Sequence, residues 1–155
     1  MTRAFVCLIA CCGLVVAGEP LPFQQSAEEL KIFELTNLER KKKDAPLLKL
    51  NPLLSKVARA HSANMARQGK FDHTLDGKDI NDRVRESGYK SNLRGENIAF
   101  GEKGAAVANI VKSWMESKEH SENLLHVDFV EMGVGIARDK DGDIYYTQVF
   151  ARPKK

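Results

Sequence analysis

The sequence contains little cysteine and holds all of it at one end. Its three cysteines, Cys7, Cys11 and Cys12, are followed by a cysteine-free stretch that runs to the end of the chain. That stretch can form no disulfide, no catalytic thiol and no zinc site built from thiolates. A domain of this length needs no cross-link, because its own core buries enough apolar surface.

The chain also lacks a strong excess of charge of one sign. Its 24 Lys and Arg residues against 21 Asp and Glu residues give a formal net charge of +3, and the two signs are interleaved. Nucleic-acid binding therefore has no electrostatic basis here, because it requires a clustered basic surface. The densest basic run, residues 39–44, is flanked by acids, and we expect it to be a solvated helix end.

The signatures of the common hydrolases are missing as well. No serine lies in a Gly-x-Ser-x-Gly elbow, and no His-Glu-x-x-His pair of zinc ligands is present. The motifs therefore give no support to a serine hydrolase or to a standard zinc hydrolase.

The chain begins with an apolar run, residues 4–17, that follows Arg3. The run is too short for a membrane-spanning helix, which needs about 20 residues, but it has the length of a secretory signal core. We predict that residues 1–17 are a signal peptide cleaved after "VVA", and that the protein is secreted or lies in the periplasm or cell envelope. The alternative is a lipoprotein signal, in which "LIAC" would place a lipid anchor on Cys11.

Local signals predict one domain over residues 26–155, after a proline-containing linker at 18–25. Ser26 and Glu29 form a capping box for a first helix, whose apolar stripe is Leu30, Phe33, Leu35 and Leu38. Asn51 and Pro52 open a second helix, which ends at Gly69. The predicted helices cover residues 26–42, 52–68, 80–86 and 105–118.

The end of the chain predicts a β-hairpin. "EMGVGIARD" and "DIYYTQVFA" alternate as strands do, and the Asp-Gly pair between them is a strong turn signal. Helices followed by a closing hairpin indicate an α+β domain with helices covering a sheet.

The four histidines are not placed alike. His61 lies on the apolar stripe of the second helix, where we expect a hydrogen-bonded core residue, and His126 is expected in a surface loop. His73 and His120 lie near helix ends among small polar residues, where sites are commonly built. Together with Glu96 they form a candidate set that could bind a divalent metal or pair a base with an orienting acid.

Several blocks, in this order, resemble the CAP superfamily, which includes the cysteine-rich secretory proteins, antigen 5 and the pathogenesis-related proteins. The blocks are "GKFDHTLDG", "DRVRESGY", "GENIAFG", "IVKSWMESKEHSENLL", "EMGVGIA" and "YYTQVFA". The chain is most similar to the bacterial SCP-like extracellular branch without disulfides. The resemblance implies a three-layer α–β–α sandwich with a surface cleft that holds two histidines and two glutamates.

When the sequence is matched to the family block by block, the resemblance places three of these cleft residues at His73, Glu96 and His120. The fourth, a glutamate in other members, falls on Ser117, and we expect the neighbouring Glu116 to point to solvent. Two more residues match the blocks. We expect Asn97 to tie down the backbone near Glu96, and Arg83 to pair with a carboxylate beneath the cleft.

The resemblance and the absence of a nucleophile favour a binding domain rather than an enzyme. We expect the cleft to bind a divalent metal, with zinc on His73 and His120, or a small anionic or amphiphilic ligand such as an envelope component. Peripheral lipid contact and a monomeric state are further expectations. One alternative is a metal-assisted hydrolase of peptides or envelope polymers with Glu96 as base, and another is a purely structural role for the polar cleft.

Overall fold

The computed structural model describes residues 23–154. The predicted signal peptide, the three cysteines and the alternative lipid anchor at Cys11 lie outside the described residues. Within residues 23–154, no helix is both long and apolar enough to cross a membrane.

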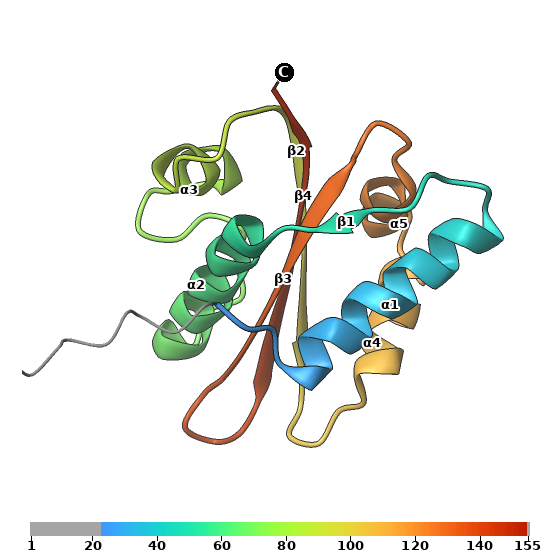
Figure 1. The fold of residues 1–155 in the computed structure, drawn as a ribbon. Helices are drawn as coiled ribbons and strands as arrows, with labels where there is room; N and C mark the ends of the chain where they lie inside the picture. Colours follow the sequence, from blue (N-terminus) through green and yellow to red (C-terminus); the bar gives the residue numbers. More distant parts are fainter. Residues whose placement is uncertain (1–22, 155) are drawn as a thin grey trace, which may run out of the picture.

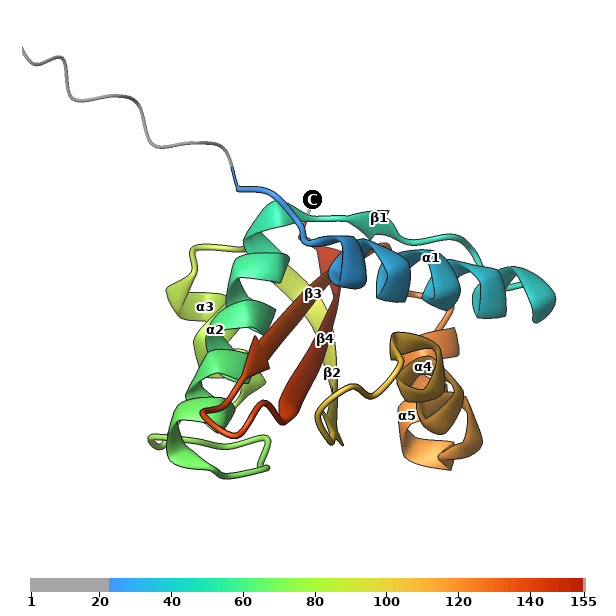
Figure 2. The same ribbon diagram turned by 90° about the horizontal axis from the view of Figure 1, so that it is seen from below.

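A four-stranded sheet forms the middle of three layers (Figures 1 and 2). Its strands lie in the order β1-β3-β4-β2, and every pairing except β1 with β3 is antiparallel. Helices α2 and α3 cover one face, and α1, α4 and α5 cover the other. The predicted α+β class and α–β–α sandwich are therefore confirmed. The strands are β1 (Lys49–Leu50), β2 (Ser91–Gly101), β3 (Glu131–Arg138) and β4 (Ile144–Pro153), and the helices are α1 (Ala27–Lys42), α2 (Pro52–Gln68), α3 (Ile80–Glu86), α4 (Val107–Glu116) and α5 (Lys118–Leu125).

Helix α1 begins with the predicted capping box, and of its predicted apolar stripe only Phe33 and Leu35 pack against the core. Ser26 and Glu29 bond each other's backbone as expected, whereas Leu30 and Leu38 are 41% and 47% exposed. The buried face includes three polar residues, which are paired with groups far away in sequence. These residues are Glu29, Thr36 and Arg40.

The basic run at residues 39–44 contains the clearest departure from the sequence prediction. Arg40 is fully buried rather than solvated, and its guanidinium donates to the main-chain oxygens of Pro46, Leu124 and His126. Leu124 and His126 lie at the end of α5, so the cation caps carbonyls that the helix leaves unpaired. Arg40 therefore locks α5 against α1.

Helix α2 begins at Pro52 and ends at Gly69 as predicted, and it approaches the sheet closely. A Cβ atom on Gly133 would lie 2.1 Å from the carbonyl carbon of Leu54, and one on Gly135 would lie 2.0 Å from the nitrogen of Arg59. Only glycine permits this contact, so the Gly-Val-Gly block of β3 sets the position of α2.

Strand β2 lies at one edge of the sheet and contains the whole "GENIAFG" block. Successive side chains of a strand point to opposite faces. Glu96 accordingly faces α2 and α3, whereas Asn97 faces α1 and α5. Ile98 on the same strand is buried, whereas Phe100 is 44% exposed.

The predicted helix over residues 105–118 is α4, which ends at Glu116, and it is followed by a helix that was not predicted, α5. Ser117 has an extended backbone, with φ −92° and ψ 126°, and it ends α4 and starts α5. Ser117 therefore does not belong to the face of α4 that carries Trp114. Glu116 is exposed, as predicted.

Candidate functional site

Glu96 is a buried carboxylate with a partner on each oxygen. It is 6% exposed, and its Oε1 accepts from Nδ1 of His73 at 2.8 Å, while its Oε2 accepts from Nη2 of Arg83 at 2.6 Å. A buried carboxylate is stable in its charged form only when it is paired in this way. Glu96 therefore links strand β2 to the loop of His73 and to helix α3.

Arg83 fixes the loop that carries His73. Its Nη1 donates to the main-chain oxygen of His73 at 2.9 Å and to that of Lys78 at 2.8 Å. The fork of a guanidinium suits several acceptors at once. The prediction that Arg83 pairs with a carboxylate beneath the site is confirmed, and the same side chain also holds the loop main chain.

Sequence reasoning missed a third neighbour of Glu96, namely His61. Its side chain is fully buried on α2, and its Nε2 lies 3.9 Å from Oε1 of Glu96, which is too far for a hydrogen bond. The main chain of Asp72 lies nearby without completing one, so neither ring nitrogen has a partner. The expectation of a core histidine is correct, but the expected hydrogen bond is absent.

Asn97 attaches helix α5 to strand β2 from the opposite face of the sheet. Its Nδ2 donates to the main-chain oxygen of His120 at 3.0 Å and to Oε1 of Gln148 at 3.2 Å. Asn123 donates to Oδ1 of Asn97 and to the main-chain oxygen of Glu96. Gln148 continues the chain of bonds to Thr36 on α1. Asn97 therefore positions the backbone at His120, a larger role than the predicted local tie.

His73 and His120 approach strand β2 from its two sides. His73 comes from the loop before α3, with its side chain 54% exposed, and His120 is half-buried on α5. We call His73, Glu96 and His120 at the outer strand of the sheet the edge site. Ser117 lies at the junction of α4 and α5, and its hydroxyl does not cap α5.

The three histidines near the edge site differ in their electrostatic surroundings. The hydrogen bond to Glu96 is the main cause of a raised pKa for His73. Burial lowers the pKa of His61, although Glu96 opposes this shift. Burial, and then the charge of His73, lower the pKa of His120. Near neutral pH, His73 is thus the histidine of the three that most readily carries a positive charge.

The donor set at the edge site does not fit a complete metal site. Among residues 23–154, no group of three or more His, Cys, Asp or Glu side chains is placed to hold a metal ion. The expected zinc has two candidate ligands, His73 and His120, whereas zinc sites in proteins use three or four. Glu96 already accepts a charge-assisted bond on each oxygen.

Comparison with known sequences identifies relatives of the chain. A model of the cysteine-rich secretory protein family, named CAP, matches residues 33–150. The uncharacterized protein YkwD of Bacillus subtilis is 37% identical over 133 residues, which cover 84% of this chain and 50% of the relative. The uncharacterized membrane protein YlbC of Bacillus subtilis is 32% identical over 129 residues, covering 83% of this chain and 35% of the relative. The chain thus spans half or less of these two relatives.

Solved structures show the same fold. An extracellular protein with an SCP domain from Bacillus anthracis matches with a TM-score of 0.71 and 33% identity, over 81% of this chain and 40% of that one. An outer surface protein from Borrelia burgdorferi matches with a TM-score of 0.76 and 24% identity, over 84% of this chain and 97% of that one. The fold and the extent of the family match together establish that the chain belongs to the CAP family of cysteine-rich secretory proteins.

Proposed function

We propose that this chain is a secreted or envelope-located binding domain, without enzymatic activity, that binds a small anionic ligand at the edge site. The observation that carries this proposal is the pair formed by exposed His73 and buried Glu96. The extracellular and outer-surface locations of the structural relatives support the proposed location.

The geometry of the pair leaves one edge of His73 for a ligand. Because a carboxylate can only accept, Nδ1 of His73 donates to Glu96, and Nε2 is the ring nitrogen left over. The raised pKa favours the imidazolium form, in which Nε2 also carries a proton. An anion at this edge would accept a charge-assisted hydrogen bond from Nε2. His120, on the other side of β2, would supply a second polar contact.

The hydrolase alternative is not favoured by the same geometry. A general base must be free to take a proton from water, whereas both oxygens of Glu96 are already bonded to cationic partners. Glu96 is therefore better suited to orient His73 than to abstract a proton.

A divalent metal is the second candidate, and one observation favours it. Histidines that bind metals commonly donate their other ring nitrogen to a carboxylate, as His73 does to Glu96. With His120 as the second ligand and no third among the described residues, we expect binding to be weaker than at a complete zinc site.

Calorimetric titration with inorganic phosphate and, separately, with zinc tests the proposal. We expect saturable phosphate binding that His73→Gln abolishes and His126→Gln preserves, since His126 is a half-buried histidine at the opposite end of α5. Phosphate binding that survives His73→Gln would refute the assignment. Micromolar zinc binding that is lost in the His73→Ala/His120→Ala double variant, without phosphate binding, would favour the metal candidate instead.

A further inference from the structure

Two histidines lie near the same oxygen of Glu96. Nδ1 of His73 lies 2.8 Å from Oε1, and Nε2 of His61 lies 3.9 Å from that oxygen. The first distance is that of a hydrogen bond, and the second is about 1 Å too long for one. The other oxygen, Oε2, is held by Arg83. A short movement of His61 would therefore bring it into competition with His73 for Oε1.

The two histidines differ in what they lose without the carboxylate. The side chain of His73 is 54% exposed, so water can solvate its ring when it leaves Glu96. The side chain of His61 is closed to solvent, and neither of its ring nitrogens has a partner. A buried cation needs an ion pair, whereas an exposed cation gains little from one. Glu96 therefore stabilises a charged His61 more than a charged His73.

The charged and titratable groups around His61 come from strand β2, from helix α3 and from the loop before α3. They are Glu96, Arg83 and His73, with the main chain of Asp72 beside them. Next to His61, Ser62 faces β3 and β4, where its bonding partners are neutral groups, the main-chain oxygen of Gly135 and the hydroxyl of Thr147. A proton on His61 therefore adds a positive charge to a site that already holds the guanidinium and the charged ring of His73.

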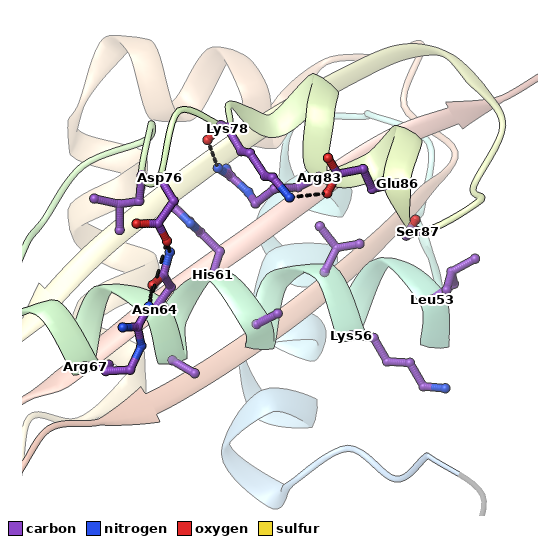
Figure 3. A pocket seen from close by; sticks show the side chains of 14 residues that line it. Leu53, Lys56, His61, Asn64, Arg67, Asp76, Lys78, Arg83, Glu86 and Ser87 are labelled. Atoms are coloured by element: carbon purple, nitrogen blue, oxygen red, sulfur yellow. Dashed lines mark hydrogen bonds and ion pairs between the residues drawn. The ribbon is translucent and has the colours of Figure 1, made fainter.

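Acidification reaches the two rings in a fixed order. The hydrogen bond to Glu96 raises the pKa of His73 above 6.5, whereas burial lowers the pKa of His61 below that value. His73 is therefore charged before His61 as the pH falls. His61 is among the residues that line a groove of about 760 Å³ between α2 and α3 (Figure 3), so solvent lies close to the buried ring.

We propose that Glu96 exchanges His73 for His61 when the pH falls. At neutral pH the carboxylate holds the ring of His73. When His61 takes up a proton from solvent, its Nε2–H donates to Oε1, and the side chain of His73 turns outward into water. Arg83 still holds the main-chain oxygen of His73, so the side chain moves and the loop stays in place.

The exchange makes the edge site sensitive to acid. Without Glu96 the ring of His73 loses both its fixed orientation and the charge that the carboxylate stabilises. An anion bound to Nε2 of His73 is therefore released when His61 becomes charged. This consequence rests on the proposed function, whereas the exchange itself takes place in the ligand-free protein.

An NMR titration of the histidine rings in the ligand-free protein, from about pH 8.5 to about pH 5, tests the exchange. We expect the ring signals of His73 to shift twice, first at a pKa above 6.5 and again together with the titration of His61. The second shift should be absent from His61→Leu and from His61→Gln, because neither side chain titrates. It should persist in His126→Gln, which removes a histidine at the opposite end of α5 from His120.

Calorimetric titration with sulfate over the same pH range tests the effect on the ligand. Sulfate keeps its charge throughout this range, unlike phosphate, so a change in affinity reports on the protein. In the wild-type protein we expect the affinity to rise as His73 becomes charged and then to fall by about three-fold or more below pH 6.5. In His61→Gln the affinity should rise and stay high.

Three results would overturn the proposal. The His73 signals shift only once in the wild-type protein, the second shift persists in both His61 variants, or the wild-type sulfate affinity rises without a later fall. Absence of sulfate binding at every pH would refute the proposed function alone, because the NMR titration tests the exchange without a ligand.

Discussion

Nδ1 of His73 lies 2.8 Å from Oε1 of Glu96, and this contact joins an exposed loop side chain to a buried carboxylate of the outer strand. The other oxygen of Glu96 is held by Arg83, which also binds the main chain of the loop. One carboxylate thus fixes both the position and the charge of His73.

Removing the charge of Glu96 should destabilise the fold. In Glu96→Gln the guanidinium of Arg83, whose side chain is 12% exposed, loses its carboxylate partner. Breaking a buried ion pair on one side typically costs about 3 kcal/mol. Urea denaturation should show this loss, whereas Glu122→Gln, which affects an exposed pair with Lys118, should change the unfolding free energy by less than about 1 kcal/mol. Equal stability of the two variants would mean that the buried pair contributes nothing.

The stabilising effect of His73 should depend on pH in a defined direction. In the folded protein the pKa of His73 is raised above the ordinary value of 6.5. The stabilisation that charged His73 gives the folded state is therefore fully present below pH 6.5, and it is lost as the pH rises through the folded pKa. His73→Gln should therefore cost more stability near pH 5.5 than near pH 8.5, roughly one unit below and two above the unfolded pKa. Unfolding free energies at the two pH values test this, and a larger loss at the alkaline pH would contradict it.

His61 should show the opposite dependence. Burial lowers its folded pKa, so the unfolded chain takes up a proton below pH 6.5 that the folded chain does not. Stability linked to neutral His61 is present above that pH and is lost on acidification. His61→Leu removes two unpaired buried nitrogens, and it should raise stability by about 1 kcal/mol at neutral pH and by more at acid pH. A destabilised His61→Leu variant in thermal melts would show that the imidazole has a bonding partner.

The close contact of α2 with the sheet should make Gly135 intolerant of any side chain. Its Cβ would lie 2.0 Å from a main-chain atom of α2, so Gly135→Ala should cost more than about 3 kcal/mol or prevent folding. Gly104→Ala is the matched comparison, because Gly104 has open space around it. An alanine there is strained only by the backbone φ of +86°. That variant should lose only about 1 kcal/mol. Similar melting temperatures for the two variants would refute the assigned packing.

Features specified by neighbouring residues could be predicted from the sequence. The capping box of Ser26 and Glu29, the start of α2 at Pro52 and its end at Gly69 all have local causes. The turn before β4 is of the same kind, with Gly142 at a φ of +90°. In each case the group that bonds the backbone lies only a few residues away in the chain. The pattern can therefore be recognised from the sequence alone.

Features that depend on distant partners could not be predicted. The buried face of α1 contains Thr36 and Arg40 because Gln148 and the carbonyl of Leu124 lie beside them, and no local pattern reveals those partners. The two-residue strand β1 exists only through its pairing with β3. The break at Ser117 likewise has no proline or glycine beside it, and the helix that follows it, α5, contacts the distant strand β2.

The candidate site was predictable in part. The order of the sequence blocks predicted the site residues His73, Glu96 and His120. The ion pair of Arg83 was predicted because a buried cation needs a carboxylate partner. The role of His61 was missed, because a histidine on an apolar helix stripe gives the same pattern whether or not its nitrogens are bonded. The shared position of His61 beside Glu96 and in the groove emerges only from the three-dimensional structure.

An NMR titration of the His73 ring, in the wild-type protein and in Glu96→Gln, each with and without inorganic phosphate, tests the proposed anion site most directly. We predict that the pKa of His73 in the wild-type protein lies above 6.5, rises further with phosphate and falls in Glu96→Gln. A His73 pKa at or below 6.5 that responds neither to phosphate nor to the loss of the carboxylate would contradict the proposed anion site.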